Sequence, residues 1–391
     1  MTVRTSPRRP GSTATGTFRN PSNRLGLDYR AEAEAFSSRR PILDAHLHLA
    51  GAHAVEIFAE VAELYGVGKF LSMTPIDLVP AVQKRLGDDV RFIAVPNYFG
   101  ADRAHEHGPG FLEAIRRFHD LGSRVVKFWS APRGLDVGRE CGEPDLLRLD
   151  GDNRIRAMEH AAELDMTFMV HVADPDTWFA TRYSDPALYG TKRSHHDALE
   201  RMLERFPVPW IAAHFGGSPE DLDLLDGLLE RHDNLSLDIS ATKWIVRELS
   251  KHSRDRVLAF FTRWRGRLLY GSDIVTHDDH LVADAAATEM AAKAGDADSA
   301  FDLYASRYWA YRTMLETSWE GESPICDPDL AAVDPDRFTD RDAPRLRGFA
   351  LPEEVLDDLY HEAAKRFFGP IENSDVPASA SSGTHGPGTA Q

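Results

Sequence analysis

The sequence predicts an α/β fold, a (β/α)8 barrel, and three observations point to it. Short runs of apolar and β-branched residues recur eight times along the chain. The ends of the first and last runs, His48 and Asp273, lie 225 residues apart, which gives steps of about 32 residues, the length of one strand–helix–strand repeat. Amphipathic helical patterns fill the intervals, and eight such units close a parallel sheet into a barrel.

The expected elements follow one another in a regular order. The strands are 41–48, 67–74, 90–98, 123–129, 166–172, 208–214, 234–240 and 266–273. The helices between them include 54–65, 111–121, 153–164, 197–206 and 219–231. A doubly wound open sheet is the alternative arrangement, but no GxGxxG motif follows an early strand, as its dinucleotide-binding form requires.

Two intervals are longer than this repeat. Segment 174–196, after the fifth strand, is aromatic and charged, and residues 276–351 separate the eighth strand from a last helix at 352–368. Long loops after the strands of a barrel form lids and substrate walls, so we expect 174–196 to cover the active-site face. The second interval holds an aromatic helical stretch, 300–318, which we expect to serve packing.

Composition and charge exclude several classes of protein. The 391 residues carry 45 Lys and Arg against 62 Asp and Glu, a net charge of −17, which argues against a nucleic-acid binder that works through bulk positive charge. With 42% hydrophobic residues the chain can bury a large core. No stretch of 18 apolar residues and no apolar leader is present, so we expect a cytoplasmic protein that does not contact a membrane.

The two ends of the chain differ in composition from its centre. Residues 1–40 are rich in Ser, Thr, Pro, Gly and Arg, and residues 371–391 form a Ser/Gly/Ala/Pro tail. Such segments bury too little apolar surface to fold. We therefore expect disordered tails at 1–40 and 371–391 and a single barrel domain over 41–370.

Histidines fall at the ends of the expected strands, where barrels place their catalytic residues. His46 and His48 close the first strand and face the same side, because side chains alternate along a strand. His171 ends the fifth strand, His214 the sixth and Asp273 the eighth. Since the carboxyl ends of parallel strands meet at one face, we expect these five side chains to converge.

A cluster of imidazoles with one carboxylate indicates a metal site. The only cysteines, Cys141 and Cys326, do not form a CxxC pair, which argues against a thiolate metal site. A single strand-end histidine is most often a hydrogen-bonded core residue, but that explanation weakens when four different strands carry ligand types. The set suits a catalytic Zn²⁺, or less selectively Fe, Mn or Co, which lowers the pKa of a bound water toward about 7.

This set resembles the metal-dependent amidohydrolase superfamily, and residues 41–370 look like the branch that includes aminocarboxymuconate-semialdehyde decarboxylase. The resemblance implies a distorted (β/α)8 TIM barrel with long loops after strands five and eight, and a divalent metal, Zn²⁺ in first place. It implies the metal ligands His46, His48, His171 and Asp273. Asp273 would also take a proton from bound water, and His214 would polarise the substrate and move protons.

Lys127 lies near the end of the fourth strand and has two interpretations. In the first interpretation, Lys127 is carboxylated, as in two-metal members of the superfamily, and bridges a binuclear site that also uses His171 and His214. The other, which we prefer, is an ordinary lysine that pairs with a carboxylate such as Asp44 or with substrate.

Cations and aromatic residues gather in the loops expected at the same face. Guanidinium and ammonium groups there would bind a substrate carboxylate, although internal pairing with acidic neighbours explains them equally well. Trp178 would contribute a wall for an unsaturated ring. The candidate substrate-binding residues are Lys127, Arg133, Arg182, Lys192, Trp178 and Lys243.

Three functions are compatible with these residues. The first is a metal-dependent hydrolase that acts on an amide, ester or lactone. The second is a lyase, a non-oxidative decarboxylase or hydratase with the same metal and acid–base groups. The third, a non-catalytic ligand-binding relative, conflicts with the intact ligand set. We expect a small anionic substrate, and a homodimer is compatible with the sequence.

Overall fold

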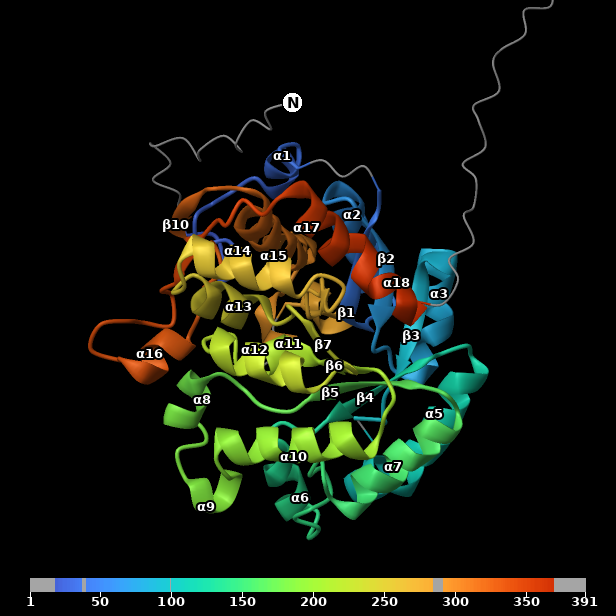
Figure 1. Ribbon diagram of the computed structural model, residues 1–391. Coiled ribbons are helices and arrows are strands. Elements are labelled where there is room, and N and C mark those ends of the chain that lie inside the picture. Colours follow the sequence, from blue (N-terminus) through green and yellow to red (C-terminus); the bar gives the residue numbers. More distant parts are fainter. Residues whose placement is uncertain (1–17, 37–39, 99, 284–290, 369–391) are drawn as a thin grey trace, which may run out of the picture.

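Nine parallel strands form one sheet in the computed structural model, which describes residues 18–36, 40–98, 100–283 and 291–368 (Figure 1). The strands are β1 (Ile42–Ala50), β2 (Val67–Ser72), β3 (Val90–Ala94), β4 (Val125–Trp129), β5 (Thr167–His171), β6 (Trp210–Ala212), β7 (Leu235–Asp238), β8 (Leu268–Leu269) and β9 (Ile274–His277). Their order in the sheet is β8-β7-β6-β5-β4-β3-β2-β1-β9, so strands that follow one another from β1 to β8 are neighbours.

The two ends of this order belong to one stretch of chain. β8 pairs with β7, and β9 pairs with β1. The residues between β8 and β9 also bond β1, because the Ala45 N–H donates to the Tyr270 carbonyl and the Asp273 N–H donates to the His46 carbonyl, both at 2.8 Å. The expected eighth strand, 266–273, thus contains β8 only, and β9 continues it beyond a kink into residues that were expected to follow the strand. The sheet returns to its start, which confirms the α/β barrel class predicted from the sequence.

Helices surround this sheet in Figure 1. Those before β6 are α1 (Tyr29–Ala33), α2 (Ala54–Leu64), α3 (Val79–Leu86), α4 (Arg103–His107), α5 (Pro109–Asp120), α6 (Gly134–Glu140), α7 (Asp152–Glu163), α8 (Asp176–Ala180), α9 (Pro186–Tyr189) and α10 (Lys192–Arg205). Those after it are α11 (Ala213–Gly216), α12 (Leu222–Arg231), α13 (Thr242–Leu249), α14 (Arg254–Arg263), α15 (Ala297–Glu316), α16 (Asp329–Val333), α17 (Glu353–Asp357) and α18 (Ala363–Phe368). Short 3₁₀ turns are η1 (Ile76–Leu78), η2 (Gly87–Asp89), η3 (Asp278–Leu281) and η4 (Ala291–Lys293), η5 (Asp358–Glu362) is a π turn, and β10 (Glu320–Glu322) pairs with β11 (Arg345–Arg347).

Two helices differ most from their expected boundaries. α10 begins at Lys192, five residues before the expected start, because Thr191 and Ser194 form a capping box that satisfies the first free N–H groups. The expected helix 352–368 is divided into α17, η5 and α18. In η5 the Asp358 carboxylate accepts a hydrogen bond from the Gly266 N–H, which ties this turn to the chain entering β8.

The aromatic helix α15 packs against α2 and fills the core. Tyr304, Tyr308 and Tyr311 on it are fully buried. The Tyr308 hydroxyl donates to the Asp44 carboxylate at 3.0 Å, and the Tyr311 hydroxyl donates to the Ile239 carbonyl. The expected packing role is confirmed, and these hydroxyls fix α15 against β1 and the end of β7.

Residues 18–36 correct the expected extent of the N-terminal tail. Tyr29 is buried and its hydroxyl donates to the Ser22 carbonyl at 2.7 Å. The side-chain amides of Asn20 and Asn23 both donate to Asp302 on α15. The segment also packs Leu27, Ala33 and Phe36 into the hydrophobic core, and the polar composition of residues 1–40 as a whole concealed these few apolar anchors. The expected tails 1–17 and 371–391 lie outside the described residues.

Among the residues that the structure describes, no helix combines the length and the apolar character needed to cross a membrane.

Candidate metal centre

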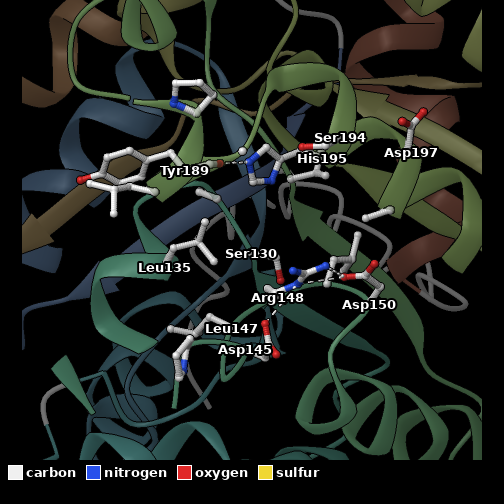
Figure 2. A pocket seen from close by; sticks show the side chains of 18 of the residues that line it. Ser130, Leu135, Asp145, Leu147, Arg148, Asp150, Tyr189, Ser194, His195 and Asp197 are labelled. Carbon is white, nitrogen blue, oxygen red and sulfur yellow. Dashed lines mark hydrogen bonds and ion pairs between the residues drawn. The ribbon is translucent and has the colours of Figure 1, made fainter. Parts of the chain in front are cut away.

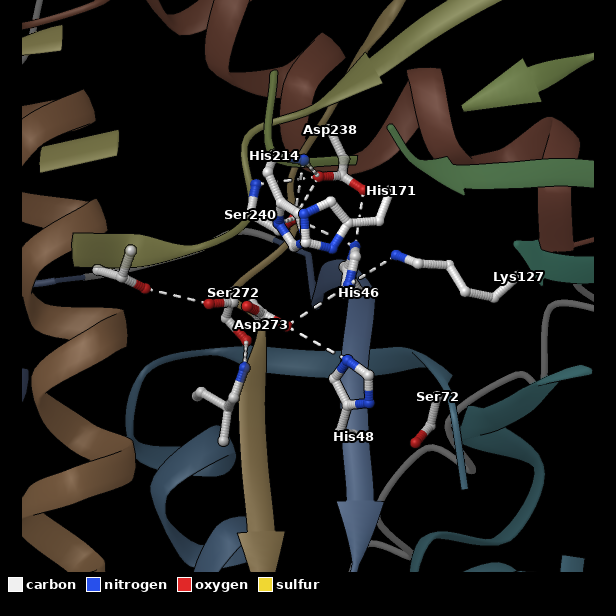
Figure 3. Close-up of polar contacts among 12 residues, drawn as sticks. His46, His48, Ser72, Lys127, His171, His214, Asp238, Ser240, Ser272 and Asp273 are labelled. Carbon is white, nitrogen blue, oxygen red and sulfur yellow. Dashed lines mark hydrogen bonds and ion pairs between the residues drawn. The ribbon is translucent and has the colours of Figure 1, made fainter. Parts of the chain in front are cut away.

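Two histidines of β1 and one aspartate after β8 face one another at the carboxyl ends of the strands (Figure 3). Asp273 Oδ1 lies 3.5 Å from His46 Nε2 and 3.3 Å from His48 Nε2. The His46 side chain is fully buried, whereas those of His48 and Asp273 are 29% and 27% exposed, so the cluster is open on one side. Two imidazole nitrogens and a carboxylate oxygen in one small volume match the donor set of a divalent metal.

Asp238, at the end of β7, orients His46. Its Oδ2 lies 2.8 Å from His46 Nδ1. Burial, followed by the charge of Lys127, lowers the pKa of His46, so the ring is neutral and carries one proton. Because a carboxylate only accepts, that proton lies on Nδ1, and the lone pair of Nε2 faces His48 and Asp273. This is the tautomer that binds a metal through Nε2.

The carboxylates of this cluster are ionised. Burial would raise the pKa of Asp238, but the hydrogen bond from His46 lowers that pKa far below its usual range. Burial acts in the same way on Asp273, where the hydrogen bond from His48 holds the pKa below its ordinary value. Both groups are therefore acceptors, and Asp273 provides a negative charge beside the two imidazoles.

His171, the third expected histidine ligand, makes a different contact. Its Nε2 lies 2.7 Å from Asp174 Oδ1, and its ring packs edge-on against the ring of His214, with centroids 4.5 Å apart. It is not in the compact group formed by His46, His48 and Asp273. For His171 to bind the same ion, its ring must leave Asp174 or use Nδ1, so its role as a ligand remains a prediction.

His214 is held in place from its backbone and from its ring. Its N–H donates to Asp238 Oδ1 at 2.9 Å, and its Nδ1 lies 2.7 Å from Ser240 Oγ. The Ser240 hydroxyl donates its only proton to Asp238, so His214 must donate to Ser240 from Nδ1. Burial and the neighbouring His171 lower the pKa of His214 well below its usual value. A neutral His214 therefore keeps an unprotonated Nε2.

Backbone strain is concentrated at this face of the barrel. His214, Phe215, Ala241 and Asp273 have φ between 53° and 67°, a region that costs a non-glycine residue of order 1–2 kcal/mol, and they follow β6, β7 and β8. Strained residues at three adjacent strand ends indicate that the fold tolerates unfavourable backbone conformations there in order to place these side chains.

Gly217 lies at the point where the loops after β5 and β6 approach most closely. Its φ is 74°, and a Cβ atom on it would lie 2.0 Å from the Ala173 carbonyl oxygen. No other residue type fits without moving one of the two loops. The contact fixes the distance between the loop that carries Asp174 and the turn that carries His214.

Lys127 points at the same cluster but does not pair with Asp44. Its Nζ lies 3.3 Å from His46 Nε2. Burial lowers the pKa of Lys127 to about 8, against the opposing effect of Asp238 and Asp273. Asp44 instead accepts from the Tyr308 hydroxyl and from backbone N–H groups, including that of His46. The suggested pairing with Asp44 is therefore wrong, because the Asp44 carboxylate is already used by these donors.

The expected substrate-binding cations divide into two groups. Lys192 binds Asp176 at 3.0 Å and also Glu220, and Arg182 lies 3.7 Å from Asp329. These two cations are neutralised within the protein. Arg133 is exposed after β4, and Lys243 is half-buried on α13, where its charge acts on Asp327 and Asp329.

Trp178 approaches the centre through a second tryptophan. Its Nε1–H donates to Asp329 at 2.8 Å, and its ring packs edge-on against Trp244, with centroids 5.0 Å apart. The Trp244 ring in turn packs against the rings of His171 and His214, with centroid distances of 6.2 Å and 5.7 Å. The segment 174–196 thus contacts the histidines directly through Asp174 and indirectly through Trp178 and Trp244, and its covering role remains a prediction.

A separate cavity lies between α6, α9 and α10 (Figure 2). Its charged groups are mutually paired: Arg148 contacts Asp145 at 3.4 Å and Asp150 at 3.2 Å, and His195 Nε2 lies 2.7 Å from the Tyr189 carbonyl. None of the residues predicted to bind metal or substrate lines this cavity.

Asp238 and Ser240 were not among the expected site residues. The signal was present, because Asp238 and Ser240 lie at the carboxyl end of the seventh predicted strand, 234–240, as His171 and His214 do in theirs. Sequence alone does not separate a metal ligand from a residue that orients one, since both are polar side chains at strand ends. Their hydrogen bonds distinguish them.

The sequence and the structure were compared with known proteins. A model of the family described as Amidohydrolase matches residues 33–369. Among solved structures, an N-acetyl-D-glucosamine-6-phosphate deacetylase from Mycobacterium smegmatis is 14% identical, with 75% of this chain and 76% of that chain covered and a TM-score of 0.32. A dihydrodipicolinate synthase family protein from Coccidioides immitis is 9% identical, covers 70% and 80%, and has a TM-score of 0.28.

No curated protein matches the sequence, and the narrower resemblance to the decarboxylase branch remains a prediction. The family match extends from within the ordered N-terminal segment to the end of α18 and contains every strand of the barrel. On this match, the chain belongs to the amidohydrolase family.

Proposed function

We propose that this protein is a metal-dependent hydrolase that cleaves an amide, ester or lactone bond of a small molecule. The observation that carries the proposal is the approach of His46, His48 and Asp273 to one another, together with the hydrogen bond from His46 to Asp238. That bond leaves the Nε2 lone pair of His46 directed at the cluster, which an ordinary core histidine has no need to do.

The donor atoms fit a single divalent ion, for which we propose Zn²⁺. His46, His48 and Asp273 would hold it, and His171 would join them after leaving Asp174. When bound, such an ion acidifies a water molecule and polarises a carbonyl group. The side chains of His48 and Asp273 are partly exposed, so a substrate can reach the cluster from solvent.

The protein's own groups supply the proton transfers. Hydrolysis moves one proton from water to the leaving nitrogen or oxygen. Asp273 is ionised and can accept that proton at a carboxylate oxygen. His214 is neutral with a free Nε2, so it can take the proton and deliver it to the leaving group. Ser240 holds the His214 ring in the orientation that this transfer requires.

Hydrolysis is favoured over decarboxylation by the state of the cations. A decarboxylase must bind a substrate carboxylate, and guanidinium or ammonium groups are the usual partners. Arg182 and Lys192, expected in that role, are already paired with carboxylates of the protein. An uncharged amide or ester needs no such cation, so the pairing of Arg182 and Lys192 does not restrict its hydrolysis.

Metal analysis of purified protein tests the proposal first. We expect about one zinc ion per chain in the wild type and in the control His53→Ala, whose side chain is exposed at the start of α2. His48→Ala should lose the metal, because it removes one of three clustered donors. With metal restored, a panel of esters, amides and lactones should be hydrolysed, with no release of CO₂ from aromatic acids. Full metal retention by His48→Ala would contradict the proposed site.

A further inference from the structure

A cavity of about 590 Å³ opens beside His48. Its lining extends from β1 and β9, across the chain that follows β2 and β3, to one face of α5. Of the four expected metal ligands, His48 alone belongs to this lining. A molecule whose reacting group lies at the cluster of His46, His48 and Asp273 can therefore extend past His48 into this space.

The inner wall of the cavity is apolar. Met73, Val95 and Phe118 are 2%, 4% and 1% exposed. Ile76 and Tyr98 are half-buried and complete the wall nearer its opening. Apolar walls of this kind bind alkyl chains and rings by removing their surface from water.

The charged groups of the cavity are mostly acidic. The lining contains four carboxylates and a single Arg or Lys, Arg117, which is exposed on α5. The carboxylates are Asp77, Glu106, Glu113 and Asp279. None of the expected substrate-binding cations Arg133, Arg182, Lys192 and Lys243 lines the cavity. A negatively charged group placed here would meet like charges and lose its hydration without a buried cation in return.

We infer that the substrate carries an uncharged apolar group, an alkyl chain or a ring, that occupies this cavity while its scissile bond lies at the metal cluster. The inference rests on the proposed hydrolase function. It replaces the anionic substrate expected from the loop cations, because the cavity next to the cluster offers walls for apolar groups and acidic side chains around them.

Binding to the cavity can be measured independently of metal and of catalysis. The chain has eight methionines, and ¹³C labelling of their methyl groups with assignment through Met73→Leu makes the Met73 methyl resonance a reporter of occupancy. The probes are hexanamide, hexanoate and hexylamine, which have the same chain length and differ in charge. Hexanamide should shift the Met73 resonance at concentrations at least tenfold lower than either charged probe. Equal binding of hexanoate, or tighter binding of hexylamine, would overturn the inference.

Two matched variants locate the binding. Ile76→Arg places a cation at the half-buried edge of this cavity, and Leu188→Arg places one in the separate cavity between α6, α9 and α10. Ile76→Arg should weaken hexanamide at least tenfold and bring hexanoate to comparable affinity. Leu188→Arg should leave both unchanged. An unchanged order of affinities in Ile76→Arg would place the probe elsewhere and refute the inference.

Ester hydrolysis separates this inference from the proposed function. With zinc restored, kcat/KM for p-nitrophenyl esters should rise about 4-fold per methylene from acetate to hexanoate, as expected for burial of each group at ~0.8 kcal/mol. If no ester is hydrolysed, the proposed function fails while the methyl titration still decides what the cavity binds. Hydrolysis without dependence on chain length would show that the acyl group lies outside the cavity and would contradict the inference.

Discussion

At the scale of single residues, Asp238 connects the expected metal ligand with the expected acid–base residue. One carboxylate oxygen accepts from His46, and the other accepts from the His214 N–H, the Ser240 N–H and the Ser240 hydroxyl. All these groups are buried. A single ionised side chain therefore fixes the tautomer of one histidine and the position of the other.

Asp238→Asn is expected to weaken zinc binding by about 10–100-fold, the usual effect of losing the partner of a ligating histidine. The amide NH₂ of the asparagine cannot accept a hydrogen bond. If it faces His46, the His46 proton must move from Nδ1 to Nε2. If it faces the other side, the three donors of His214 and Ser240 lose their acceptor. Competition with a zinc-binding dye measures the affinity, with Asp226→Asn as control because its partners, Trp264 and Arg256, lie outside the centre. Unchanged affinity would show that Asp238 does not orient the ligand.

His214→Asn is expected to keep the metal and lose roughly 10²–10⁴-fold in rate, the usual contribution of a positioned acid or base. The asparagine can reproduce the Nδ1 hydrogen bond to Ser240 but not the free Nε2. Metal content and kcat measured on the same preparation separate the two effects. Metal loss as large as in His48→Ala would instead support a two-metal site with Lys127 as bridge.

At the scale of elements, apolar runs predicted β1 to β8, because buried parallel strands are continuous apolar runs, but β9, β10 and β11 were not predicted. The kink between β8 and β9 could not be read in this way, since it depends on Asp273 adopting a positive φ. Strand-end positions singled out the candidate residues His46, His48, His171, His214 and Asp273, whose roles remain predictions. They did not reveal that His171 contacts Asp174, because side-chain rotation is not encoded in spacing.

Gly217→Ala is expected to destabilise the protein more than Gly142→Ala, although the two glycines have nearly equal φ, 74° and 72°. A Cβ at Gly142 meets nothing within 4 Å, so the only loss of stability in that variant is the cost of the left-handed conformation, about 1–2 kcal/mol. At Gly217 the Ala173 carbonyl must also move. Thermal unfolding compares the two, and equal losses would mean that the approach of the loops after β5 and β6 is not constrained.

At the scale of the whole molecule, the barrel buries histidines that its unfolded chain would expose. His196 is 1% exposed on α10, and its Nε2–H donates to the Gly216 carbonyl at 2.9 Å, beside the turn that carries His214. Burial lowers its pKa to about 4. His107, buried at the end of α4, has its pKa lowered to about 3 by burial and by Arg154. Composition shows the number of histidines, but only the fold shows which of them lose contact with water.

Acid should therefore unfold the protein, in part through His196. Above the unfolded pKa of about 6.5 the ring is neutral in both states and its contribution to stability is fully present. As the pH falls from 6.5 toward 4, the unfolded state binds a proton that the folded state does not bind, which lowers the free energy of unfolding by up to about 3 kcal/mol at ~1.4 kcal/mol per pH unit.

His196→Gln keeps a donor for the Gly216 carbonyl and cannot be protonated. Its free energy of unfolding, measured in urea between pH 7 and pH 4, should fall less steeply than that of the wild type, while the exposed control His53→Gln should follow the wild type. Parallel curves for all three proteins would mean that His196 is protonated in the folded state and that its burial does not control acid stability.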